Sequence, residues 1–348
     1  MTESVAPTLT KSPPAARRFS LRDFAPLISL FVIVAFFTIT NQDFLTLGRL
    51  RLVLQQGAVL AIVSTGLTFV LLCAEIDLSV GMLALWTACA CGVLYEQPFA
   101  AGPGGDGAIS GLTLALVIAI PLVSSLVLGL ISGVLTVSSR LPSFIITLAM
   151  MNIADGLAKS LTQSEKFAVP QVLEEIGNGR WHVAGTFYLP YSAILAAVVL
   201  LIGHLVLQHT RFGRYVYMTG GNREAARLAG VRTGWIVIAC LAISAVTAGL
   251  GGLINAGRLN GVTLDQNADL LLSAVACVVL VGTSLFDGEG GIGRTVIGVL
   301  TFSVLGVGLS GLIAEVDWLE DRTRPLLMGV VLMAALVING FLSHKSSR

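Results

Sequence analysis

Long apolar stretches constrain this chain more than any other feature of its sequence. A helix of roughly 20 apolar residues crosses a hydrocarbon core about 30 Å thick, and about ten stretches here approach that length. They are Ala25–Ile39 and residues 52–72, 79–95, 111–137, 143–161, 190–208, 234–255, 269–286, 292–313 and 325–342. The predicted fold class is therefore all-α: a polytopic transmembrane helical bundle of about ten spans.

Composition agrees with a membrane location. The 348 residues are 55% hydrophobic and only 12% charged, and the mean hydropathy is +0.87. Such values are typical of integral membrane proteins. The net charge of +1 lacks the concentrated basic excess of a nucleic-acid binder, so we expect membrane lipid and no nucleic acid among the partners.

Cysteine and histidine give no sign of a disulfide framework or a metal site. An odd number of cysteines within or beside apolar runs is unlike the pattern of secreted, disulfide-rich proteins. We interpret them as small core residues: Cys73, Cys89, Cys91, Cys240 and Cys277. The four histidines lack metal-ligand spacing such as H-x-x-x-H. The sequence therefore predicts no metal.

Topology follows from the basic residues. Residues 1–24 are polar and carry Arg17, Arg18 and Arg22 just before the first apolar run, which predicts a disordered cytoplasmic tail and an uncleaved first helix. Most of the remaining basic residues fall on the same side of a ten-span layout, so the positive-inside rule places both termini in the cytoplasm. The membrane domain would span residues 25–343, with segment 163–189 on the periplasmic side.

The stretch Arg211–Arg232 interrupts the apolar pattern. It holds five arginines and a single acid, Glu224, between two long apolar runs. This pattern predicts a water-facing loop, residues 209–233, with a short helix that Asn222 caps and Gly230 ends. A helix of seven or eight residues is too short to be stable alone in water. It therefore needs a surface to dock against.

Signatures of enzymes are absent from the sequence. There is no G-x-x-x-x-G-K-[ST], and the glycine-rich run Gly288–Gly293 lacks the lysine that would hold a phosphate. Neither G-x-S-x-G nor H-E-x-x-H occurs. We expect a non-enzyme without a bound cofactor. If transport is driven by ATP, another subunit binds it.

Two groups of polar residues lie at membrane depth, where ionisable side chains usually serve a pathway or a partner. Asp77 and Ser79 lie between two apolar runs, although the form I-D-L-S-V-G favours a cytoplasmic turn in which Asp77 caps the next helix. On the fifth span, helical spacing aligns four side chains, which either line a water-filled path or include an i,i+4 ion pair that supports packing. These four are Asn152, Asp155, Lys159 and Thr162.

Four motifs resemble one known family, the permease subunits of bacterial ATP-binding-cassette importers for ribose, xylose and galactose. They are A-E-I-D-L-S-V-G at Ala74–Gly81, L-P-S-F-I-I-T-L-A-M-M at Leu141–Met151, the long basic stretch at Arg211–Val231, and V-G-T-S-L at Val281–Leu285. In the family's order they cover about residues 44–338. The third motif is the most specific.

The resemblance implies partners and site residues. A separate ABC ATPase subunit, a second copy or homologue of the permease and a periplasmic sugar-binding protein would complete the importer. The coupling helix that rests on the ATPase corresponds to Gly213, Arg214, Gly221, Asn222, Glu224, Ala225, Ala226, Arg227 and Gly230. We assign to the translocation path Asp77, Ser79, Asn152, Asp155, Thr283 and Ser284.

Acidic departures from the family's motifs concern the substrate. Glu75 stands where the family usually has glycine, Asp155 where it often has arginine, and Asp287 and Glu289 follow the fourth motif. The transported solute is accordingly a monosaccharide (a pentose or a hexose) or a polyol, and not ribose by default. The alternative from another class is an ion-coupled secondary transporter of a small polar solute, with Asp77 or Asp155 as the ion site.

Overall fold

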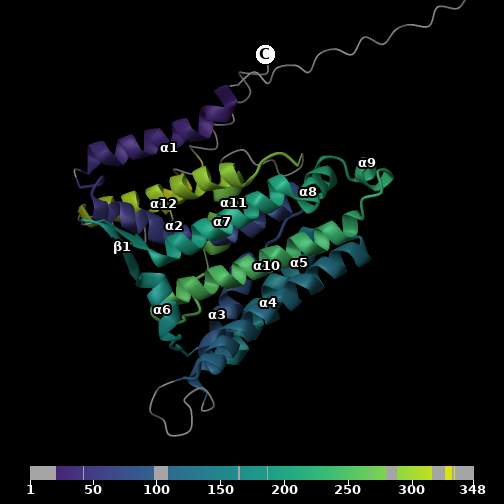
Figure 1. Cartoon of the computed structure of the whole chain (residues 1–348), viewed down its shortest axis with the longest axis horizontal. Coiled ribbons are helices and arrows are strands. Elements are labelled where there is room, and N and C mark those ends of the chain that lie inside the picture. Colours follow the sequence, from purple (N-terminus) through teal and green to yellow (C-terminus); the bar gives the residue numbers. More distant parts are fainter. Residues whose placement is uncertain are drawn as a thin grey trace, which may run out of the picture.

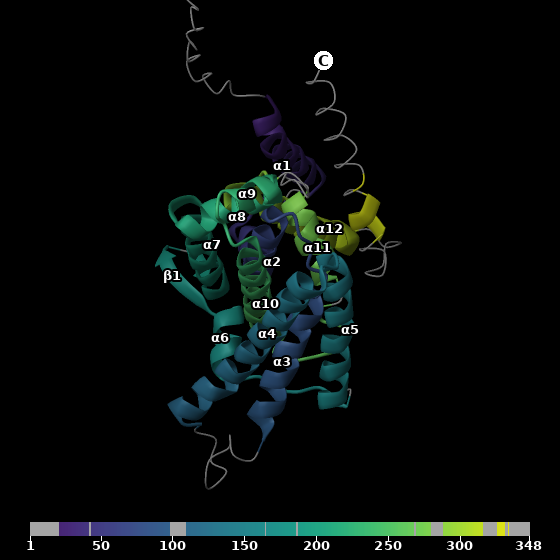
Figure 2. The same ribbon diagram turned by 90° about the vertical axis from the view of Figure 1, so that its right-hand side faces the viewer.

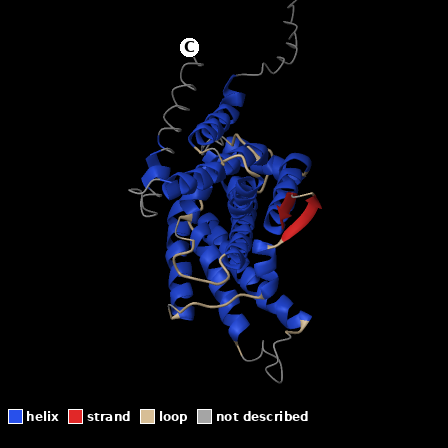
Figure 3. Ribbon diagram, turned by 90° about the vertical axis from the view of Figure 1, so that its left-hand side faces the viewer, coloured by secondary structure: helices blue, strands red, loops and turns tan. Residues whose placement is uncertain are grey.

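The described part of the chain is a helical bundle with one small hairpin (Figures 1 and 3). The computed structural model describes residues 21–41, 43–97, 109–163, 165–185, 187–267, 269–279, 288–315, 326–330 and 333. The predicted all-α class is therefore right except for the two strands. The predicted tail lies outside the described residues as far as residue 20.

Nine of the predicted apolar stretches contain a named helix. The first five are α1 (Leu21–Thr40), α2 (Leu47–Leu72), α3 (Val80–Glu96), α4 (Gly111–Ser139) and α5 (Ser143–Thr162). The others are α7 (Tyr191–His209), α10 (Thr233–Arg258), α11 (Leu270–Val279) and α12 (Ile292–Glu315). The last predicted stretch, 325–342, is described only at residues 326–330 and 333, which are helical.

Length and composition allow six of the described helices to cross a membrane. They are α2, α4, α5, α7, α10 and residues 292–313 of α12. The apolar parts of α1, α3 and α11 are shorter, 10–17 residues each. A polytopic helical membrane protein is the architecture that these helices form.

Two helices form the centre of the bundle. The most apolar windows of α2 and α10 are each 78% buried, whereas those of α4, α5 and α7 are 22% buried. Small residues let these helices approach closely: a Cβ at Gly66 of α2 would lie 2.8 Å from the Cα of Ser244 on α10. The outer helices expose apolar side chains, as lipid contact requires.

The two ends of the bundle differ. At one end lie α8 (Arg211–Gly221) and α9 (Arg223–Leu228), on the right in Figure 1 and facing the viewer in Figure 2. At the other end lie α6 (Gln171–Asn178) and the antiparallel pair β1 (Arg180–Ala184) and β2 (Phe187–Pro190). The stretch 163–189, for which the sequence predicted no element, thus carries a helix and most of a hairpin.

Candidate coupling site

Two short helices, and not one, occupy the basic stretch. The expected helix after Asn222 is α9, and the preceding residues, predicted as loop, form α8. Thr210 Oγ1 accepts a hydrogen bond from Gly213 N at 3.1 Å and so caps α8. Asn222 separates the helices because its backbone is extended, φ −155° and ψ 99°.

The predicted start and stop of α9 are confirmed. Asn222 Oδ1 accepts a hydrogen bond from Ala225 N at 2.9 Å, as an N-cap should. Gly230 has φ +83°, a left-handed conformation that glycine adopts without the steric cost of a Cβ. The six-residue α9 is therefore defined at both ends by its own sequence.

Packing fixes one side of α9 and leaves the other open. Ala226 and Val231 are buried in an apolar cluster with the end of α2 and the start of α10. Glu224, Ala225 and Arg227 are exposed. So is Leu228, with 83% of its surface accessible. Leu228 thus adds an apolar side chain to the charged, exposed side of a firmly held helix.

α8 lies directly across the end of α2. A Cβ at Gly220 would collide with the carbonyl of Leu72, so only glycine allows this approach. Gly288, φ +62°, packs as closely on the other side, where a Cβ would lie 2.7 Å from Gly221 N. α8 is therefore held between the end of α2 and the segment that precedes α12.

A tyrosine on α8 reaches that second segment. Tyr217 donates its hydroxyl hydrogen to Gly290 O at 3.2 Å and accepts from Gln208 Nε2 at 3.4 Å. Burial raises the pKa of Tyr217, partly opposed by the charge of Arg294. The hydroxyl therefore stays protonated and able to donate at neutral pH.

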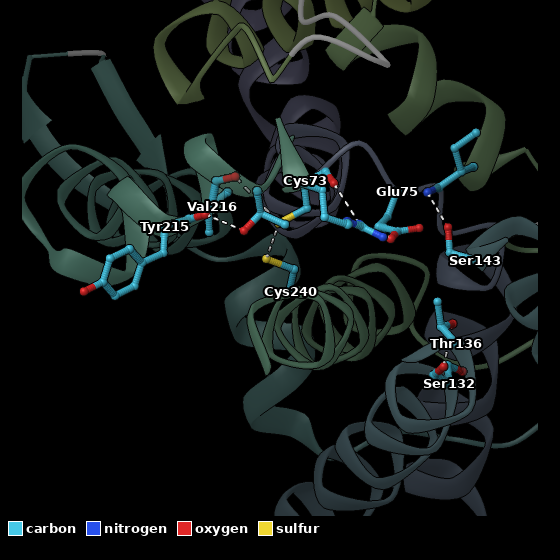
Figure 4. A network of polar contacts seen from close by, with 11 residues as sticks. Cys73, Glu75, Ser132, Thr136, Ser143, Tyr215, Val216 and Cys240 are labelled. Atoms are coloured by element: carbon cyan, nitrogen blue, oxygen red, sulfur yellow. Dashed lines mark hydrogen bonds and ion pairs between the residues drawn. The ribbon is translucent and has the colours of Figure 1, made fainter. Parts of the chain in front are cut away.

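A polar network ties α9 to the segment after α2 (Figure 4). Arg223 Nη2 donates to the carboxylate of Glu75 in an ion pair and to Cys73 O at 3.5 Å. The thiols of Cys73 and Cys240 lie 3.3 Å apart, which links the end of α2 to α10. The first residue of α9 is thus connected to both central helices.

The assigned residues not yet placed lie at α8. Gly213 is buried where α8 turns back on α7, and a Cβ there would collide with the backbone of Leu207. Arg214 is exposed and donates from Nη1 to Thr210 O at 3.3 Å. Gly221 ends α8 and is exposed. All nine residues assigned to coupling therefore lie on α8, on α9 or in the turns that end them.

Asp77 lies inside the bundle and not on a surface turn. It is 1% exposed, and its carboxylate accepts from Ser79 N at 2.9 Å, Ser79 Oγ at 2.6 Å and Ser244 Oγ of α10 at 2.7 Å. α3 begins at Val80, one residue after the predicted stretch 79–95 begins, and has no side-chain cap. Asp77 and Ser79 therefore form one buried polar group that joins the break before α3 to α10.

The predicted stripe on α5 is divided. Asn152 and Asp155 lie on the outer side of the described chain, and Asp155 Oδ2 pairs with Lys159 Nζ at 2.7 Å. Asn152 Nδ2 donates to Leu148 O of the same helix at 2.9 Å. Thr162 is buried and bonds Ala158 O. Thr283, Ser284 and Asp287 lie outside the described residues.

Three residues at this site were not singled out from the sequence. Leu228 is exposed on α9. Tyr217 bonds Gly290, and Arg223 forms an ion pair with Glu75. Only Leu228 left a signal: an apolar side chain next to Arg227 on a helix predicted to face water. The partners of the other two are 73 and 148 residues away in the chain.

Known proteins support a transport role. A family model described as "Branched-chain amino acid transport system / permease component" matches residues 50–336. The ribose import permease protein of Escherichia coli K12 is 31% identical over 314 residues, 90% of this chain and 92% of that protein. The fructose import permease protein of Rhizobium meliloti is 28% identical over 322 residues, 90% and 84% of the two chains.

A more distant relative has a different cargo in its name. The autoinducer 2 import system permease protein of Photorhabdus luminescens is 26% identical over 322 residues, 92% of this chain and 90% of that protein. No solved structure matches the chain. The matches are to multi-pass inner-membrane permeases and not to enzymes. The chain therefore belongs to this family of transport-system permease components, and the resemblance of its motifs to sugar permeases of ATP-binding-cassette importers is confirmed.

Proposed function

We propose that this chain is the translocation subunit of an ATP-binding-cassette importer for a monosaccharide or polyol. The observation that carries the proposal is the pair α8–α9, which is exposed on one side and joined on the other to both central helices. Three import permeases for small polar solutes among its relatives support the cargo class. The chain itself would bind no ATP and hold no cofactor.

The proposed topology has ten spans with both termini in the cytoplasm. Residues 1–24 form the cytoplasmic tail and 25–343 the membrane domain. Placing the coupling loop 209–233 in the cytoplasm agrees with the position of α8 and α9 at one end of the bundle, opposite β1 and α6 (Figure 1). Segment 163–189 would then meet a periplasmic sugar-binding protein.

The ATPase subunit would bind the exposed side of α9. Glu224, Arg227 and Leu228 provide a charged and an apolar contact within two helical turns. Beside them a shallow groove of about 370 Å³ is lined by Arg227, Arg232 and Trp235, among others. Tryptophan and arginine, which line this groove, are among the residues enriched in the hot spots of protein interfaces.

Movement of α9 would reach the membrane through fixed contacts. Ala226 is buried against the ends of α2 and α10, and Arg223 holds Glu75 at the start of the break before α3. When ATP binding closes the ATPase pair, α8 and α9 would shift as a rigid body. The central helices would follow, which opens the permease to the other side.

A second permease copy or a homologue would complete the path. Asn152 and Asp155 lie on a face of α5 that no other described helix covers, so they would line a path only between two subunits. Asp77 and Ser79 would support that path from within the bundle. Thr283 and Ser284 remain assigned to it on the resemblance alone.

Existing hydrogen bonds argue against ion-coupled secondary transport. The Asp77 carboxylate already accepts three hydrogen bonds from serine groups, and Asp155 is paired with Lys159. A proton or sodium site needs a carboxylate that changes partners during transport. A self-contained transporter would also have no use for α9.

Charge reversal on α9 tests the proposal. Glu224→Arg and Arg227→Glu should abolish sugar uptake by cells that carry the complete importer, and the ATPase should no longer co-purify. The chain should still insert and elute as a folded species in size-exclusion chromatography. Arg140→Glu, which reverses an exposed charge at the end of α4, should leave uptake intact. Normal uptake by both α9 variants would refute the coupling role.

A further inference from the structure

A cavity of about 490 Å³ lies far from α8 and α9. Its walls come from α2, α10, α11, α12, the segment between α10 and α11, and the helical residues 326–330. Arg258, one of the lining residues, ends α10, whose first residue Thr233 follows α9. At about 1.5 Å per residue, α10 separates the cavity from α9 by roughly 35–40 Å. None of the residues assigned above to coupling or to the path lines it.

Polar and apolar side chains line the cavity together. The polar ones include Gln56, Asn255, Arg258, Gln266 and Ser273. The apolar ones include Val59, Leu60, Leu270 and Phe302. Its volume is within the range of small-molecule sites, about 300–1,000 Å³. Its lining, which combines apolar side chains with a few polar groups, is also typical of such sites.

Hydrogen bonds hold the polar wall in place. Asn255 Oδ1 accepts from Arg258 Nε at 3.2 Å and from Nη2 at 2.9 Å. Asn255 Nδ2 donates to Asn267 Oδ1 at 2.9 Å and to Gln266 O at 3.3 Å. Gln266 Oε1 accepts from Thr263 N at 3.2 Å. The amide groups are therefore oriented before any ligand arrives, which lowers the entropy cost of binding.

Two amide nitrogens in the segment between α10 and α11 lack an acceptor among the described residues. Gln266 Nε2 and Asn267 Nδ2 are buried and have no hydrogen-bond partner in the described part of the chain. A buried donor without an acceptor costs about 1–3 kcal/mol, and native proteins leave few of them. Gln266 lines the cavity whereas Asn267 does not, so the Gln266 amide is the one of the two that a ligand acceptor in the cavity would satisfy.

We propose that this cavity is a binding site for a monosaccharide or polyol within a single permease subunit; the inference rests on the sugar-import function proposed above. A sugar hydroxyl both donates and accepts, which matches amide, serine and carboxylate groups. Its C–H face would pack on Phe302 and the leucines of the lining. Asp265 and Asp269 are exposed at the rim and would repel an anionic ligand. The guanidinium of Arg258 already bonds Asn255.

The site assigns part of the cargo selectivity to the permease. A sugar released on the side of α6 and the hairpin would meet hydroxyl-recognising groups before it moves further. Solutes without hydroxyl groups would leave the amide of Gln266 unpaired, and a site built for hydrogen bonds rejects such analogues strongly. The permease would thus act as a second filter after the binding protein.

Ligand binding to the full-length chain in lipid nanodiscs tests the proposal. Saturation-transfer NMR would be recorded with D-ribose, D-xylose, D-galactose, D-fructose and ribitol, and with L-leucine as a solute without hydroxyl groups on its side chain. We expect at least one sugar or polyol to bind, and L-leucine not to. Gln56→Leu should weaken that binding by about three- to tenfold, because one or two hydrogen bonds are lost. Ser273→Phe should abolish it by filling the cavity.

A matched control removes a glutamine elsewhere. Gln97→Leu changes an exposed residue after α3 that does not line the cavity, and it should bind sugar like the wild type. Uptake of the same solutes by cells with the complete importer, measured for every variant, separates the two proposals. If uptake by the wild type is normal but no sugar binds, or the cavity variants bind unchanged, the cavity is not the site and the import function stands.

Other results bear on both proposals. Binding of L-leucine in place of sugars would overturn the sugar assignment of the cavity. Failure of wild-type cells to take up any of the five sugars and polyols would overturn the import function, and the inference with it.

Discussion

At the scale of single residues, the two ion pairs of the described chain differ in their surroundings. Glu75 and Arg223 join two elements, and the Glu75 side chain is only 9% exposed. Asp155 and Lys159 lie one turn apart on α5, with side chains 31% and 55% exposed. Exposed i,i+4 pairs contribute about 0.2–0.5 kcal/mol. A nearly buried carboxylate that loses its partner costs far more.

A double-mutant cycle distinguishes the pairs. Arg223→Met should lower the free energy of unfolding by about 2 kcal/mol, since Glu75 is left buried without its cation. The double variant Arg223→Met/Glu75→Gln should lower the free energy of unfolding by less than Arg223→Met alone. Lys159→Met, the matched control, should cost under about 0.5 kcal/mol. Thermal unfolding in detergent measures each variant. Additive effects of the two changes at Glu75 and Arg223 would contradict the pairing.

At the scale of elements, α8 depends on glycine to reach the membrane helices. Gly220 meets the carbonyl of Leu72, and Gly221 meets Gly288. The two segments concerned, the end of α2 and the residues before α12, are far apart in sequence. Because α8 contacts both segments, the pair α8–α9 has one fixed position on the bundle.

Gly220→Val should displace α8 from that position. Overpacking costs about 1–3 kcal/mol, so we expect sugar uptake to fall about five- to hundredfold if coupling requires α8 to be packed there. The arginines of α8 and α9 should also be cut faster by trypsin in inside-out vesicles.

Gly293→Val is the matched control for this change. A Cβ at Gly293, in the first turn of α12, meets nothing within 4 Å, so uptake and cleavage should stay as in the wild type. Unchanged trypsin cleavage in Gly220→Val would show that α8 does not need this contact.

At the scale of the whole molecule, the separation of α8–α9 from the hairpin gives each end its own environment. Leu228 is 83% exposed at one end and Trp181 is 61% exposed at the other. All five native cysteines are buried. The wild-type chain therefore offers a low background for thiol labelling.

Labelling of one added cysteine, with the five buried native cysteines kept, tests the proposed topology. A membrane-impermeant maleimide should label Trp181→Cys in spheroplasts, because this residue would face the periplasm. It should label Leu228→Cys only after the membrane is permeabilised. The wild type controls for the buried thiols. Labelling of Leu228→Cys in closed spheroplasts would reverse the orientation.

Local chemistry made much of this protein predictable from its sequence. Runs of about 20 apolar residues require helices in a membrane, and the helices occur where the runs are. Asn222 and Gly230 define α9 because caps and left-handed glycines act within a few residues. The family motifs were likewise contiguous, so the comparisons agree with them.

Only the tertiary structure decided which distant residues meet. The sequence favours a surface cap for Asp77, whereas the structure buries it and bonds it to Ser244. The sequence relates the acidic departure Glu75 to the substrate, whereas the structure pairs it with Arg223. The cavity at Gln56, Asn255 and Gln266 is lined by residues of α2, α10, α11 and α12, and no residue spacing along the chain predicts it. Local sequence sets where a helix begins and ends, whereas long-range packing decides which polar groups share a space.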